Sequence, residues 1–288
     1  MKRRRPEAEE GGLRRLPPEV IEDPTDGVAL CVSFATFGFA LVRLAEQPRK
    51  VDTLRRVAPQ FFQGDSEDKR NLVARLRDDE QGFGGFHAPN RAKEVFRFRS
   101  GLRERLREDG EDGLSDAAWE LMEATYEGLW ASTRTMVLAC LTATGSSSED
   151  ADELLADVLE PLTFCPGSQC RSRLLTPPMD IFRYYNRKDC KDVNCEPHVD
   201  PGLITVIPVS ATPGLSVWHP GREEWWPVEQ LVQSENEGCK RPRPGSAVID
   251  GAVPEGDSGP VAVAIVGEAL DLFTAGLLPA RVPAQSRP

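Results

Sequence analysis

Residues 197–206 read Pro-His-Val-Asp-Pro-Gly-Leu-Ile-Thr-Val, and this stretch decides the interpretation of the whole chain. His198 and Asp200 lie two positions apart, and side chains at that spacing on an extended backbone point to the same side of a strand. An imidazole nitrogen and a carboxylate oxygen can therefore meet one cation there. By itself the triplet is weak evidence, because an ordinary polar turn beside Pro201 and Gly202 contains the same residues.

The composition excludes several classes of protein. The chain has 288 residues, 40% of them hydrophobic, so it can bury a sizeable core and is not disordered throughout. Its net charge of −11 repels phosphate backbones and disfavours a nucleic-acid partner. No window approaches the roughly 18 to 20 consecutive apolar residues of a membrane span. We therefore expect no nucleic-acid partner and no membrane span.

The first residues and the cysteines bear on where the protein is found. Residues 2–5 are basic but are not followed by the apolar stretch of a signal peptide, and they read as a solvated tail rather than a nuclear signal. The seven cysteines are an odd number in a chain too large to need disulfide staples. These features predict a cytoplasmic protein whose thiols are mostly reduced.

The residue pattern changes along the chain from helical periodicity to short strand-like runs, and this change predicts an α+β fold. Residues 1–26 read as a flexible charged lead-in. Residues 27–177 read as a region of one strand and several helices. Residues 178–288 read as an antiparallel β-core of short strands, which is typical of a sandwich or barrel.

Helices are expected where apolar residues recur at spacings of three and four. The longest is residues 114–144, capped by Ser115, and shorter ones are residues 49–62, 66–79 and 148–159. The glycine-dense residues 81–89 read as a loop, and residues 82–89 as a candidate lid. Strands are expected at 37–42, 180–185, 203–209, 215–218, 224–227, 247–250 and 261–266.

Several segments match one known family in the same order. They are residues 37–42 (Phe-Gly-Phe-Ala-Leu-Val), 58–62 (Ala-Pro-Gln-Phe-Phe), 67–69 (Glu-Asp-Lys), 93–96 (Lys-Glu-Val-Phe), 182–185 (Phe-Arg-Tyr-Tyr), 198–205, 213–217 (Pro-Gly-Leu-Ser-Val) and 267–270 (Gly-Glu-Ala-Leu). In this order they resemble the isopenicillin N synthase-like, plant-type branch of the 2-oxoglutarate- and Fe(II)-dependent dioxygenases. The resemblance covers most of the chain.

The resemblance implies a fold, a metal site and an activity. The fold is a double-stranded β-helix, or jelly roll, with Fe(II) bound by His198 and Asp200 at its mouth. Tyr185 matches a tyrosine whose hydroxyl touches cosubstrate or substrate, and its plain alternative is a core aromatic residue on a strand. The implied reaction couples oxidative decarboxylation of 2-oxoglutarate to oxidation of a small organic substrate, which the sequence does not identify.

The sequence departs from the family pattern near its C-terminus. The pattern expects a His-Arg-Val motif whose His is the third ligand of the two-His-one-carboxylate face, and Pro283 stands at that place. Proline has no lone pair for a metal. The 2-oxoglutarate-binding Arg of the family and the last strands of the roll are also missing, and neither Arg281 nor Arg287 has the family's position. We therefore expect a partial roll, weak Fe(II) binding, 2-oxoglutarate binding in question and a chain that is a poor or inactive catalyst.

Two other histidines are candidates for the vacant position. His219 follows His198 by only 21 residues and lies in a Trp-His-Pro-Gly sequence that reads as the end of a hairpin. His87 lies in the glycine-rich segment, where an exposed loop histidine is the simpler interpretation.

A structural zinc site is the strongest alternative. Cys165, Cys170, Cys190 and Cys195 form two pairs at spacings that suit thiolate ligands, and His198 follows the second pair. Such a site would take His198 away from iron. The apolar residues 179–185 between the two pairs read as a strand rather than a zinc-finger loop.

A non-catalytic interaction protein is the third interpretation. Trp225 and Trp226 are adjacent, and neighbours on a strand face opposite sides, so we expect one to be buried and the other exposed. Residues 241–244 (Arg-Pro-Arg-Pro) would then be a docking segment, although a solvated loop is the simpler interpretation.

Overall fold

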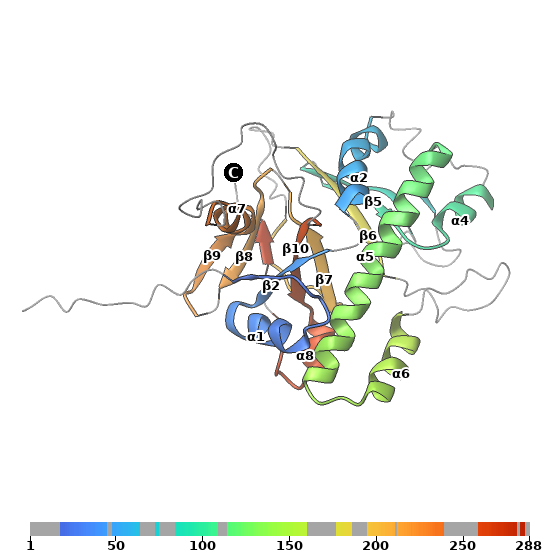
Figure 1. Ribbon diagram of the computed structural model, residues 1–288. Helices are drawn as coiled ribbons and strands as arrows, with labels where there is room; N and C mark the ends of the chain where they lie inside the picture. The colour runs from blue at the N-terminus through green and yellow to red at the C-terminus, as the bar shows by residue number, and fades with distance from the viewer. Residues whose placement is uncertain are drawn as a thin grey trace, which may run out of the picture.

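The computed structural model describes residues 18–44, 48–63, 73–74, 84–90, 92–108, 114–159, 177–185, 195–210, 212–219, 221–238, 259–280 and 283–285 (Figure 1). Several predictions fall outside these residues. They are the lead-in before residue 18, the strand at 247–250, the docking segment at 241–244, and Cys165, Cys170, Cys190, Arg281 and Arg287.

The first sheet has the strand order β1-β2-β10-β7, with β1 (Val20–Ile21), β2 (Phe39–Arg43), β10 (Val261–Val266) and β7 (Ile204–Pro208). The inner strand β10 pairs antiparallel with both β2 and β7, and its six residues are all buried. Its alternate residues enter different cores: Ala264 packs towards the helices, while Val263 packs towards a second sheet. Small side chains on the helix side let the helices approach closely.

The second sheet has the order β11-β8-β9 and is antiparallel throughout, with β8 (Leu215–His219), β9 (Glu224–Pro227) and β11 (Pro283–Gln285). It shares a hydrophobic core with the first sheet. That core contains Phe39, Leu41, Val217, Trp226, Val228, Val261, Val263 and Ile265. Helix α7 (Val228–Gly238) follows β9 directly.

Helices cover the opposite face of the first sheet. They are α1 (Gly27–Phe37), α5 (Asp116–Ala143), α6 (Ser148–Leu159) and the short α8 (Glu268–Phe273). The predicted α5 and its cap are confirmed, because the Ser115 side chain accepts a hydrogen bond from Ala118 N. Helix α1 was not expected. The Asp26 carboxylate caps its first turn, and Gly38 ends it with a φ of 83°.

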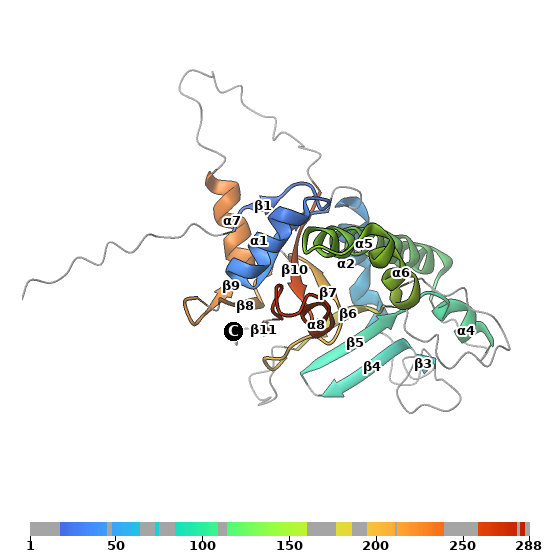
Figure 2. The same ribbon diagram turned by 90° about the horizontal axis from the view of Figure 1, so that it is seen from below.

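A third sheet lies beside the other two, in the order β3-β4-β5-β6 (Figure 2). Its strands are β3 (Val73–Ala74), β4 (Gly84–Asn90), β5 (Lys93–Phe98) and β6 (Met179–Tyr184), and all neighbours are antiparallel. One face packs on α2 (Pro48–Phe61), α4 (Leu102–Glu108) and the first half of α5. Figure 1 shows α5 running from this sheet at one end to α8 at the other, so one long helix serves both cores.

Two sequence predictions are wrong in this region. The glycine-dense segment is a strand rather than a loop or lid from Gly84 onward, and the expected helix at 66–79 contains a strand at Val73–Ala74. A Cβ at position 84 would lie 2.9 Å from both the Arg97 carbonyl oxygen and a Leu102 methyl carbon. Gly84 therefore permits a close approach of strand and helix, which local sequence does not reveal.

Other predicted elements are confirmed within a residue or two of their expected ends: α2, α6, β6, β7, β8, β9 and β10. Strands from before residue 178 pair with strands after it, since β2 joins β10 and β5 joins β6. Helix α2, which packs on the third sheet, also contacts the end of β7 in the first sheet. There the Arg55 side chain donates hydrogen bonds to the carbonyl oxygens of Pro208 and Val209 at 2.6 and 2.7 Å. In the described part of the chain, every helix is too short or too polar to cross a membrane.

We expect Gly27→Ala to lower the free energy of unfolding by about 1–3 kcal/mol, measured by urea denaturation. A Cβ at position 27 would lie 2.1 Å from the Ala139 carbonyl oxygen, which would force α1 and α5 apart. Helix propensity alone favours alanine over glycine by up to about 1 kcal/mol. A net loss of unfolding free energy would therefore be due to the steric clash. Gly214→Ala is the control, since its added Cβ meets nothing within 4 Å. An equal effect of both substitutions would contradict the close packing.

The paired tryptophans yield a second stability prediction. Trp226 is 8% exposed and contacts the rings of Phe37, Phe39 and His219, whereas Trp225 is 40% exposed. We expect Trp226→Ala to cost about 3–5 kcal/mol of unfolding free energy. Trp225→Ala should cost only about 1 kcal/mol, through its edge contact with Trp218. Denaturant titration of the two variants checks the difference, and the reverse order would mean that β9 presents its other face to the core.

Candidate metal site

His198 and Asp200 face each other in the turn that leads into β7. The distance from His198 Nε2 to Asp200 Oδ1 is 3.1 Å. The His198 side chain is 49% exposed and that of Asp200 is 21% exposed. The two predicted side chains therefore converge, and solvent can reach them.

The backbone of this turn is fixed to the junction between β10 and α8. Glu268 N donates to Asp200 O at 2.8 Å, Ala269 N to Gly202 O at 3.1 Å, and Gly267 N to Leu203 O at 2.9 Å. These three bonds hold the carbonyl group of Asp200 and two carbonyl groups of the turn that follows it.

Gly267 permits this contact by having no side chain. A Cβ there would lie 2.1 Å from Gly202 O and 2.9 Å from Asp200 O. Sequence reasoning identified residues 267–270 only as a matching segment. Their structural role is to hold the turn that carries Asp200.

The position of one proton on the His198 ring follows from its neighbours. Nδ1 lies 2.8 Å from the Glu196 carbonyl oxygen, and a carbonyl oxygen can only accept a hydrogen bond. We therefore assign the proton to Nδ1 in the neutral ring, which leaves the Nε2 lone pair directed at Asp200. This is the arrangement in which metal-bound histidines are held, with the other ring nitrogen donating to a carbonyl.

Tyr185 lies at the end of β6 in the third sheet. Its hydroxyl donates to a carboxylate oxygen of Glu94, its backbone N donates to Ala92 O at 2.7 Å, and the Arg183 guanidinium lies 5.0 Å from its ring centre. Glu94 was not predicted, because 91 residues separate it from Tyr185 in sequence. The phenol is thus held by a polar cluster on β5 and β6 rather than packed as a plain core residue.

The other two histidines are placed elsewhere. His219 ends β8 at the predicted hairpin and is buried between the two sheets, with its ring 4.4 Å from that of Trp226 and 5.8 Å from that of Phe37. The prediction of an exposed loop position for His87 is wrong, because it lies on β4 opposite Val95. Burial, reinforced by the Arg97 charge, lowers the pKa of His87. Pro283 lies on β11 opposite Val217.

The described part of the zinc alternative consists of Cys195 and His198. The Cys195 sulfur lies 3.7 Å from His198 Nδ1, on the opposite side of the ring from Asp200. Burial raises the pKa of the Cys195 thiol, which opposes a thiolate. Within the described residues, no group of three or more His, Cys, Asp or Glu side chains could hold a metal ion.

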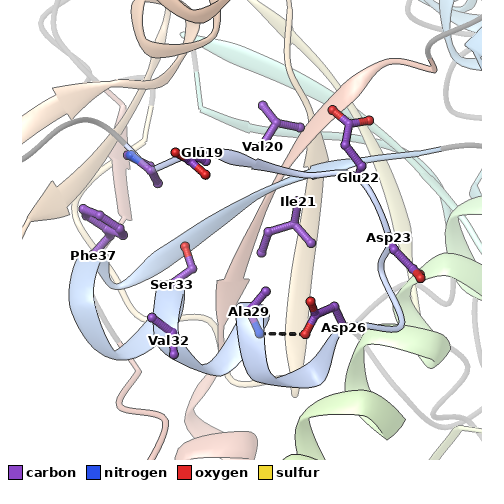
Figure 3. A pocket seen from close by; sticks show the side chains of 11 residues that line it. Glu19, Val20, Ile21, Glu22, Asp23, Asp26, Ala29, Val32, Ser33 and Phe37 are labelled. Atoms are coloured by element: carbon purple, nitrogen blue, oxygen red, sulfur yellow. Dashed lines mark hydrogen bonds between the residues drawn. The ribbon is translucent and has the colours of Figure 1, made fainter.

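A cleft of about 560 Å³ lies between β1 and α1 (Figure 3). The strand order places β1 and β7 at opposite edges of the first sheet, so the cleft and the His198–Asp200 pair are separated by its inner strands. Its rim carries Glu19, Glu22, Asp23 and Asp26. Three of these carboxylates already bind Arg43, Thr25 or the first turn of α1, so the cleft has no evident catalytic group.

Comparisons with known proteins were made by sequence and by structure. No family model matches the chain, and no curated protein sequence matches it. A structure assigned to the 2OG-Fe(II) oxygenase family from Caulobacter crescentus is 16% identical, with 94% of this chain and 80% of that one covered and a TM-score of 0.61.

Two eukaryotic structures are similar to the same degree. A full-length Neurospora crassa protein, solved in complex with alpha-KG and thymine, is 14% identical over 97% of this chain and 81% of that one, with a TM-score of 0.63. Dioxygenase for auxin oxidation 1 of Arabidopsis thaliana, in complex with 2-oxoglutarate, is 12% identical over 95% and 88%, with a TM-score of 0.62. The resemblance predicted from the sequence is confirmed: the chain has the fold of the 2-oxoglutarate- and Fe(II)-dependent oxygenase family.

Proposed function

We propose that the chain is a 2-oxoglutarate- and Fe(II)-dependent dioxygenase-like oxidoreductase acting on a small organic molecule, with His198 and Asp200 as metal ligands. The observation that carries the proposal is the orientation of the His198 ring, whose Nδ1 is bound to the Glu196 carbonyl while Nε2 faces Asp200. The fold comparisons support it, because structures with this fold hold 2-oxoglutarate.

The geometry of the pair fits a cation. In the neutral ring, Nε2 and Asp200 Oδ1 both present lone pairs, which repel each other unless a positive charge lies between them. Two ligand atoms at about 2.1 Å from a metal ion and at right angles to each other are about 3.0 Å apart. The observed separation is 3.1 Å. At this separation, His198 Nε2 and Asp200 Oδ1 would both bind one metal ion.

We also propose that the two facing sheets form a partial double-stranded β-helix around this site. Strands β2, β10 and β7 make one wall and β11, β8 and β9 the other, with a shared apolar core between them. The His198–Asp200 turn enters β7, which pairs with β10, and β11 lies beside β8. Pro283 on β11 is the position where the family pattern expects the third ligand.

The metal would be weakly held by these residues. His219 is buried against Trp226, and His87 is on a strand of the third sheet, so neither completes the face. Iron and 2-oxoglutarate together would supply the oxidising step, in which O₂ converts the cosubstrate to succinate and CO₂ and oxidises the substrate. The chain's own residues fix the ligand pair, and the hydroxyl of Tyr185 is our candidate for contact with the cosubstrate.

The metal site can be tested without turnover. We expect Mn(II), followed as the free ion by electron paramagnetic resonance, to bind weakly at one equivalent. His198→Ala and Asp200→Ala should each weaken binding by more than about tenfold, because each removes one of two ligands. His87→Ala is the matched control and should leave the affinity unchanged.

Equal Mn(II) affinity of the wild-type chain and His198→Ala would overturn the assignment and leave the pair as a structural ion pair. Zinc retained near one equivalent after dialysis, and lost on substitution of Cys195, would instead support the zinc site.

The missing ligand can be supplied. We expect Pro283→His to tighten metal binding by roughly tenfold or more, and to produce or increase Fe(II)-dependent succinate formation from 2-oxoglutarate. Ala284→His is the control, because neighbouring positions of a strand lie on opposite faces. An identical response of the two variants would show that position 283 does not correspond to the third ligand.

A further inference from the structure

Helices α1 and α5 are in unusually close contact on the helix-covered face of the first sheet. A Cβ added to Gly27 would meet the Ala139 carbonyl oxygen at 2.1 Å and the Ala143 Cβ at 3.1 Å. The backbones of the two helices therefore touch without an intervening side chain. Cys31 lies one helical turn after Gly27, and Cys140 is next to Ala139, so both cysteines lie at this contact.

The two cysteines contact each other across the helix pair. The Cys31 thiol donates a hydrogen bond to the Cys140 carbonyl oxygen, with the sulfur 3.9 Å from the oxygen. Both are free thiols, 109 residues apart in sequence. A disulfide requires Cα atoms within about 7 Å of each other. The backbones of α1 and α5 touch beside both cysteines, at Gly27 and Ala139, and this close approach favours such a link.

The environments of the two thiols differ. Cys31 is partly exposed at the edge of the contact, whereas Cys140 is fully buried among Leu30, Met136 and other apolar residues. The hydrogen bond from the Cys140 thiol lowers the pKa of Cys31. The same bond, together with burial, raises the pKa of Cys140. Cys31 is thus the accessible sulfur with the greater thiolate character, and Cys140 is the sheltered partner.

We propose that Cys31 and Cys140 form a peroxide-reactive dithiol pair, which closes to a reversible disulfide between α1 and α5. The proposal concerns a part of the fold that the oxygenase assignment does not use. Helix α1 also forms one wall of the cleft of Figure 3, through Ala29, Val32 and Ser33. The disulfide would fix that wall to the long helix α5.

The reaction requires a hydroperoxide as oxidant. The Cys31 thiolate attacks the peroxide oxygen, breaks the O–O bond and becomes a sulfenic acid, while the leaving oxygen takes up a proton as water or an alcohol. The Cys140 sulfur then attacks the Cys31 sulfur, forms the S–S bond and releases the second oxygen as water. Two thiols are oxidised and one peroxide is reduced, and a dithiol reductant reverses the step.

The test is peptide mapping of the full chain in its native state. Reduced protein is treated with hydrogen peroxide, remaining thiols are alkylated, and the unreduced digest is analysed by mass spectrometry. We expect a linked peptide pair containing Cys31 and Cys140, removed by dithiothreitol, and joint loss of alkylation at both residues. The same treatment in urea should abolish this preferred pairing, because the helix contact is lost.

Variants separate the two roles. In Cys140→Ser, we expect Cys31 to stop at the sulfenic acid and to be labelled by dimedone at least several-fold more than in the wild-type chain. In Cys31→Ser, Cys140 should remain alkylatable after peroxide and unfolding. Cys195→Ser is the matched control and should keep the linked pair. Oxidation of Cys31 with Cys140 left reduced in the wild-type chain, or linkage of Cys31 to another cysteine, would overturn the proposal.

Discussion

The close approach of Gly267 to the turn at residues 200–203 is the contact on which the candidate site depends. Strand β10 is buried on both faces and sets the register of β7, with Val266 opposite Ile204. The chain then enters α8, whose first amides bind the carbonyls of Asp200 and Gly202. Apolar packing fixes β10, β10 fixes β7 and the junction, and the junction fixes Asp200. A side chain at position 267 would collide with the carbonyl oxygens of Gly202 and Asp200 and would separate the turn from α8.

The sequence predicted those elements whose signal is local. Helix α5 has a serine cap and a long apolar periodicity, and β10 is an uninterrupted apolar run, so both were placed almost residue for residue. The prediction of a loop at residues 81–89 was wrong because Gly84 permits a long-range contact with Arg97 and Leu102 and does not form a turn. Helix α1 was missed because its apolar, partly β-branched residues resemble a strand, while Asp26 and Gly38 supply the caps that decide for helix.

In the candidate site, too, local features were predictable from the sequence and long-range contacts were not. His198 and Asp200 do meet, as their spacing predicted, but they meet in the turn before β7 and not on a strand. The hold of Glu94 on the Tyr185 hydroxyl and the burial of His219 against Phe37 depend on how distant strands pair. No local pattern encodes such contacts.

A purely structural role for the His198–Asp200 pair accounts poorly for how it is held. The His198 side chain is half exposed, and ion pairs at exposed positions stabilise a fold by only about 0–1 kcal/mol. Yet the backbone from Asp200 to Leu203 is held by three hydrogen bonds, and it requires glycine at 267. The Glu196 carbonyl also orients the ring so that the lone pair of its neutral form points at a carboxylate. Rigid positioning of two polar side chains that solvent can reach is what a ligand-binding site needs, and the metal site that we propose would use it.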